Sequence, residues 1–93
     1  MKYVLIIHEV NEYTIWKKIL DEASGIRKKA GEISYQVLKY QSDSQKIVHF
    51  SMWSSLEKAK QFFQSPALIK IRNEAGVKSP HFIYLEQLES GIL

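Results

Sequence analysis

Two histidines lie in apolar stretches where an imidazole could transfer protons. His8 falls near the end of an apolar run over residues 3–10, and His49 falls within another over residues 46–53. An imidazole in an apolar wall can act as a general base near neutral pH, and it can equally be a core residue or lie at a subunit interface. We take His8 as the catalytic candidate. His81 follows a proline, and we expect it in a solvated loop.

Aromatic side chains near these histidines could form the walls of a ligand pocket. Tyr13 and Trp16 are three residues apart at the start of a predicted helix, and Trp53 ends the second apolar run. Flat apolar ligands favour aromatic walls with one or two polar groups that set their orientation. Aromatic residues at helical spacing more often supply ordinary core packing. The hypothesis is a substrate-binding wall of Tyr13, Trp16, His49 and Trp53 beside His8.

Hydrophobic periodicity predicts four strands that would carry these residues. The first covers about residues 2–10 and is apolar on both parities, which is typical of a strand covered on both faces. The second and third cover 33–41 and 46–53, joined by a polar hairpin connection. The fourth follows Pro80.

Apolar residues at three- and four-residue steps predict a first helix over residues 11–30. Asn11 is a favourable N-cap, and Gly31 is a favourable residue just past the helix end. Gly25 weakens the middle of this helix. Arg27, in a basic cluster near its end, is expected to face water, although it could clamp an anionic ligand group.

Capping signals predict two further helices between the third and fourth strands. Ser54 and Glu57 form a capping-box pattern at the start of the first of them. Ser65 followed by Pro66 is typical of an N-cap with proline at the first helical position, and Gly76 would end this second helix.

The order of elements is βαββαβ, which indicates an α+β fold of the ferredoxin-like plait. We expect one domain over residues 1–93, with a four-stranded antiparallel-type sheet and helices on one face. The strands of His8 and His49 are taken as adjacent and parallel. On that assumption Trp53 and His8 would end at the same edge of the sheet.

Composition excludes several classes of function. The chain has 93 residues, a net charge of +3 and no cysteine, so disulfides, thiol catalysis and thiolate metal sites are excluded. Three histidines without ligand spacing do not predict a metal site. No run is long enough to cross a bilayer, no signal-peptide pattern is present, and we expect a cytoplasmic location. The third strand lacks the glycines of an RNA-recognition motif, so no nucleic acid is expected.

The segment from His8 to Trp16, with Trp53 and Ser65-Pro66, resembles the dimeric α+β barrel superfamily. This group includes antibiotic biosynthesis monooxygenases and small stand-alone proteins called cyclase-like. In the latter, a strand ending in histidine runs into a Tyr-x-x-Trp helix start. The resemblance implies a homodimer whose sheets pack face to face. The apolar residues on both faces of the strands also favour a dimer, because a monomer would expose a large apolar patch.

These observations lead to two hypotheses of different classes. The first is a cofactor-independent small-molecule enzyme, monooxygenase-, isomerase- or cyclase-like, that acts on a flat or aromatic substrate between sheet and helices. The second is a non-catalytic module of the same fold for small-ligand binding or dimerisation. An enzyme needs a titratable group inside the pocket, whereas a binding module needs only the walls.

Overall fold

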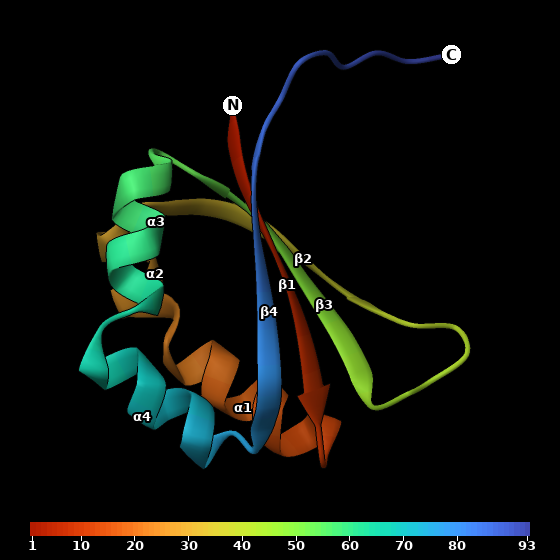
Figure 1. The fold of residues 1–93 in the computed structure, drawn as a ribbon, viewed down its shortest axis with the longest axis vertical. Coiled ribbons are helices and arrows are strands. Elements are labelled where there is room, and N and C mark those ends of the chain that lie inside the picture. Colours follow the sequence, from red (N-terminus) through yellow and green to blue (C-terminus); the bar gives the residue numbers. More distant parts are fainter.

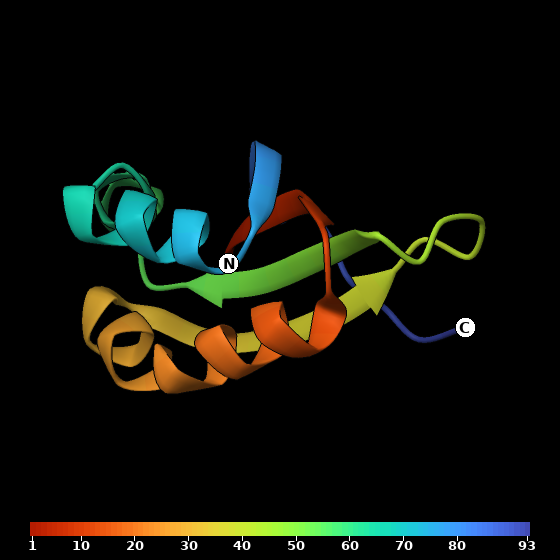
Figure 2. The same ribbon diagram turned by 90° about the horizontal axis from the view of Figure 1, so that it is seen from below.

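The computed structural model describes residues 1–93, apart from the side chain of Ser79. The elements are, in order, β1 (Lys2–Val10), α1 (Tyr13–Glu22), α2 (Ser24–Ala30), β2 (Glu32–Lys39), β3 (Lys46–Trp53), α3 (Leu56–Phe63), α4 (Pro66–Glu74) and β4 (Val77–Glu86). Figure 1 shows the helices gathered on one face of the sheet, and Figure 2 shows α1 and α2 as one pair and α3 and α4 as another. The predicted α+β plait is confirmed.

The four strands form one sheet in the order β2-β3-β1-β4, and every neighbouring pair is antiparallel. The expectation that β1 and β3 are parallel was therefore wrong. The α1–α2 connection returns the chain so that β2 runs in the same direction as β1, and the hairpin then reverses β3. As a result His8 pairs with Ile47, whereas Trp53 pairs with Lys2 at the other end of β1.

The two faces of the sheet are buried to different extents. On β1 and β3 every second side chain points to the helices and is buried, and these residues are Val4, Ile6, His8, Val10, Ile47, His49, Ser51 and Trp53. The alternate residues, such as Leu5 and Phe50, are only half-buried on the open face. Both parities are apolar, as the sequence indicated, but the helices cover only one of them.

The predicted single helix over residues 11–30 is in fact two helices. Its interruption lies at Ala23, which has φ −85° and ψ 2°, rather than at Gly25. The N-cap position of α1 is Glu12 instead of Asn11. Gly31 ends α2 as expected, with φ 119°. A Cβ at this position would lie 2.6 Å from the Ser54 hydroxyl oxygen, so both the backbone conformation and the space favour glycine.

The later helices begin with serine caps, one of them displaced by a residue from the prediction. The N-cap of α3 is Ser55, whose hydroxyl accepts a hydrogen bond from the Lys58 N–H at 3.0 Å. The predicted cap Ser54 therefore lies outside the helix. The predicted Ser65 N-cap of α4, followed by Pro66 at the start of the helix, is confirmed.

Strand boundaries differ from the sequence prediction at both ends of the sheet. β2 begins at Glu32 and ends at Lys39, and β4 begins at Val77, before Pro80 rather than after it. His81 consequently lies within a strand, where it pairs with Ile7 and is exposed.

Candidate functional site

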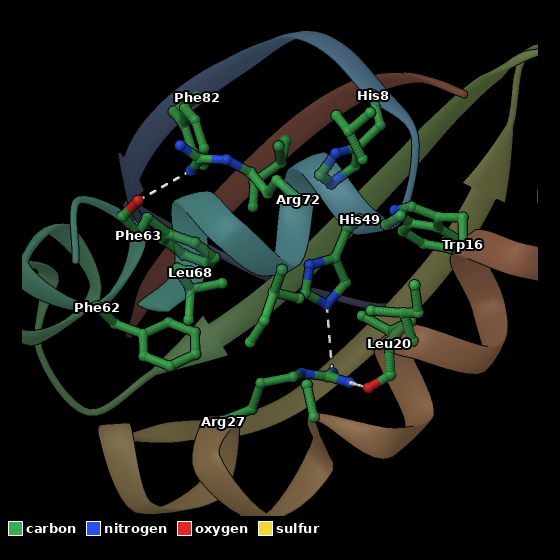
Figure 3. A pocket seen from close by; sticks show the side chains of 16 residues that line it. His8, Trp16, Leu20, Arg27, His49, Phe62, Phe63, Leu68, Arg72 and Phe82 are labelled. Atoms are coloured by element: carbon green, nitrogen blue, oxygen red, sulfur yellow. Dashed lines mark hydrogen bonds between the residues drawn. The ribbon is translucent and has the colours of Figure 1, made fainter. Parts of the chain in front are cut away.

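An apolar cavity lies between the sheet and the helices. Its volume is about 60 Å³, measured as the space that the centres of water molecules can occupy. At roughly 10–15 Å³ for each centre, it has room for a few waters. The apolar lining includes Ile6, Trp16, Leu20, Phe63, Leu68, Ile71 and Phe82. Besides the indole of Trp16, four lining residues have side-chain nitrogen atoms that can carry charge, and Figure 3 shows them: His8, Arg27, His49 and Arg72.

His8 is the titratable group most isolated from polar partners. Strand alternation turns it toward the helices, where its side chain is 6% exposed. Its Nδ1 atom is buried without a hydrogen-bond partner among the described residues. Burial, assisted by the positive charges that His49 and Arg72 can carry, lowers the pKa of His8 from 6.5 to about 3. The imidazole is therefore neutral at physiological pH.

Trp16 covers His8 from the side of α1. Its ring is 3% exposed, and its centroid lies 5.4 Å from that of His8. Tyr13, one turn earlier, is 43% exposed and packs 5.9 Å from Trp16 by ring centroids. Tyr13 does not line the cavity; it borders a separate surface hollow with Val37 and Leu38.

A buried ion network forms the opposite wall of the cavity. Arg27 of α2 donates two hydrogen bonds to the Glu32 carboxylate, from Nε to Oε1 at 2.6 Å and from Nη2 to Oε2 at 2.8 Å. Its Nη1 donates to the Leu20 carbonyl at 3.0 Å. Arg27 and Glu32 are only 6% and 8% exposed. The centre of the Tyr35 ring lies 4.5 Å from the central carbon of the Arg27 guanidinium.

His49 joins this network through the same carboxylate. Its Nε2 lies 3.0 Å from Glu32 Oε2, and because a carboxylate only accepts, this nitrogen carries the hydrogen and donates it. Arg27 Nη2 approaches the same ring nitrogen at 3.4 Å, as Figure 3 shows. Burial would raise the pKa of Glu32, but the hydrogen bonds and charges of Arg27 and His49 outweigh it and hold that pKa below its ordinary value.

Arg72 approaches the cavity from α4. Its Nη1 donates to the Phe63 carbonyl at 2.9 Å, and its guanidinium lies 5.2 Å from the centre of the Phe82 ring. No carboxylate of the described residues lies within ion-pair distance of it. Burial lowers the pKa of Arg72, yet a guanidinium remains charged at any physiological pH.

The structure brings together only part of the predicted site. His8, Trp16 and His49 line one cavity. Trp53 lies at the other end of β1, where its indole N–H donates to the Ser51 hydroxyl at 2.8 Å and its ring packs 5.3 Å from Phe63. Its inclusion in the site depended on the parallel strands, and with antiparallel strands it belongs to the core.

Sequence reasoning did not identify Glu32 and Arg72 in this region, and it named Arg27 only as a possible anion clamp. Arg27 was expected in water, but α2 starts anew after Ala23 and turns this side chain inward. One signal was available. Arg27 and Glu32 carry opposite charges on either side of Gly31, whose left-handed turn folds the strand start back onto the helix end. Arg72 gives no comparable signal in the sequence.

The fold and the cavity together define an α+β plait with an internal, mostly apolar site. No protein-family model matches the chain, and no curated protein matches it in sequence. Solved structures do match its fold. SnoaB, a cofactor-independent oxygenase from Streptomyces nogalater, superposes with a TM-score of 0.76 at 6% identity over 96% of this chain and 94% of that one.

Two further structures are similar over the full length. A candidate antibiotic biosynthesis monooxygenase from Deinococcus radiodurans has a TM-score of 0.70 at 13% identity, covering 100% of this chain and 98% of that one. Rv0793 from Mycobacterium tuberculosis has a TM-score of 0.68 at 15% identity over 99% and 100%. The chain therefore has the fold of antibiotic biosynthesis monooxygenase-like proteins, as the resemblance implied. At these identities the likeness shows the fold alone.

Within the described residues, no helix is long and apolar enough to cross a membrane.

Proposed function

We propose that the chain is a small-molecule enzyme without metal or organic cofactor, which removes a proton from a flat or aromatic substrate in the cavity beside His8. The observation that carries this proposal is His8 itself, a buried imidazole in the lining of an apolar cavity, whose Nδ1 atom has no hydrogen-bond partner among the described residues. The similarity to SnoaB, a cofactor-independent oxygenase, supports the same class of chemistry. Proton removal from a carbon or hydroxyl beside a carbonyl is a first step that oxygenation, isomerisation and cyclisation can share.

The resting protein differs from the sequence hypothesis in one chemical respect. A general base works best when its pKa lies near the working pH, whereas burial holds the pKa of His8 at about 3. The imidazole would accept a proton only as negative charge develops on the bound substrate. In an apolar site, that anion and the new imidazolium attract each other more strongly than they would in water. The apolar lining of the cavity thus favours a proton transfer that the low pKa of free His8 does not favour.

A non-catalytic ligand-binding module is the second candidate. The low pKa of His8 favours it, because a neutral imidazole can accept a hydrogen bond without ever becoming protonated. The small volume of the cavity is consistent with either role.

Deuterium exchange into 2-indanone, a flat ketone with acidic C–H bonds, separates these candidates. The parent protein in D₂O should accelerate exchange over buffer, and His8→Gln should lose about 10²-fold or more of that acceleration, the usual contribution of a general base. His81→Asn, which changes an exposed histidine, is the matched control and should behave as the parent. Exchange no faster than buffer would favour the binding module. An oxygen electrode then shows whether turnover consumes O₂.

We also propose that two copies pair through the open face of the sheet. The half-buried apolar residues on this face are Tyr3, Leu5, Ile7, Val48, Phe50, Met52 and Ile83. The rings of Tyr3 and Phe50 stack there at 5.0 Å. A contiguous apolar face of this kind on a monomer is typical of an interaction site.

Light scattering at micromolar concentration should give twice the chain mass of 10.8 kDa. Phe50→Glu places a charge at the middle of the face and should shift the mass to that of one chain. Lys60→Glu changes an exposed residue on α3, on the opposite side of the sheet, and should not. A parent protein that remains a monomer at this concentration would contradict the face-to-face pairing.

A further inference from the structure

We propose that the cavity binds a planar organic anion, whose charged oxygens meet the Arg72 guanidinium while its ring lies among the apolar walls. The inference rests on the proposed site and names the class of its ligand: a one-ring carboxylate or an anion of similar shape, such as an enolate or phenolate.

The hydrogen bonds of Arg72 leave most of its donors available. A guanidinium has five N–H groups, and the structure assigns one of its nitrogens, Nη1, to a protein acceptor, the Phe63 carbonyl. The contact with the Phe82 ring helps to fix the position of the guanidinium but uses none of its N–H groups. In Figure 3 the side chain passes between His8 and Phe82 at the cavity wall. Its fork geometry suits the paired oxygens of a carboxylate.

The charge balance of the cavity favours an anion. Arg27 is neutralised by two hydrogen bonds to Glu32, so this pair contributes no net charge. Arg72 has no carboxylate partner among the described side chains. His8 is neutral, and His49 donates to Glu32. The partly buried positive charge of Arg72 therefore remains uncompensated beside apolar walls, and a bound anion would compensate it.

The walls and the volume set the size of this ligand. Trp16, Phe63 and Phe82 offer aromatic surfaces. The cavity holds about as much as a few waters, which is close to the bulk of one substituted ring. An anion bound at Arg72 would also offset the charge that disfavours protonation of His8. Binding would thereby make His8 a better proton acceptor.

Fluorine NMR titration with 4-fluorobenzoate and 4-fluorobenzamide tests the inference, because the two probes share shape and differ in charge. We expect the benzoate to bind the parent about tenfold or more tightly than the amide at low salt, as a charge-assisted hydrogen bond allows. In Arg72→Gln this preference should fall to within twofold. Lys70→Gln removes an exposed charge from the same helix and should keep the full preference.

Arg72→Lys distinguishes the loss of the charge from a folding defect. It retains the charge and should keep a reduced preference for the benzoate. Equal affinity of the parent for both probes would overturn the inference, and so would a preference that survives Arg72→Gln. If neither probe binds, the anion site is likewise overturned. If His8-dependent exchange of 2-indanone persists without benzoate preference, the proposed enzyme stands and only the anion site fails. Benzoate preference without exchange supports the anion site in a binding module.

Discussion

Glu32→Gln should lower the free energy of unfolding by about 3–5 kcal/mol, because it leaves the buried Arg27 charge without its carboxylate. The two side chains are nearly inaccessible to water, so solvent cannot replace the lost partner. The substitution preserves shape, and its cost is therefore electrostatic rather than a packing defect. Urea denaturation at pH 7 measures it directly.

The surface pair between Lys2 and Glu86 is the matched control. Its atoms are 2.8 Å apart, close to the 2.6 Å of the buried pair, but its side chains are 41% and 63% exposed. Glu86→Gln should therefore change stability little, since water solvates the remaining lysine. If Glu32→Gln costs no more than Glu86→Gln, Arg27 is not held by this carboxylate in solution.

Removing both buried charges should cost less than removing one. In Arg27→Met with Glu32→Gln, no unpaired ion remains, and the loss of stability should be smaller than for Glu32→Gln alone.

The stability that this network contributes should also fall in acid. Because the folded-state pKa of Glu32 is depressed, its contribution is present above the unfolded-state pKa and is lost as pH falls through the folded value.

The fold was predictable because most of its strands and helices carry local signals. Alternation marked β3 residue for residue, and the Ser65-Pro66 step marked the start of α4. The relative direction of β1 and β3 has no local signal. It follows from the path of the whole chain. Because the strands were assumed to be parallel, Trp53 was wrongly predicted to lie beside His8.

The site was less predictable because its charges meet through tertiary packing. His8 and Trp16 are close in sequence and were found together. Arg72 meets the Phe63 carbonyl and the Phe82 ring only after α4 has packed beside α3 and β4. The inward turn of Arg27 depends on the helix interruption at Ala23, for which the next two residues, Ser24 and Gly25, give only a weak hint.

His8 should make the protein lose stability in mild acid. Above pH 7 the ring is neutral in both states and contributes no pH dependence. Below 6.5 the unfolded chain takes up a proton, whereas the folded chain resists it until pH falls to about 3. Acid therefore favours unfolding across this window. At 1.36 kcal/mol per unit, the 1.5 units from 6.5 to 5 remove about 2 kcal/mol.

Urea denaturation of the parent and of His8→Leu at pH 7 and pH 5 isolates this contribution from that of the other titrating groups. Leucine fits the apolar strand and cannot take up a proton, so the variant should lose about 2 kcal/mol less than the parent over this interval. His81→Asn should lose as much as the parent, because it alters an exposed ring. An equal loss in parent and His8→Leu would mean that His8 reaches water in the folded state. The burial of His8, and with it the proposed role of this residue, would then be wrong.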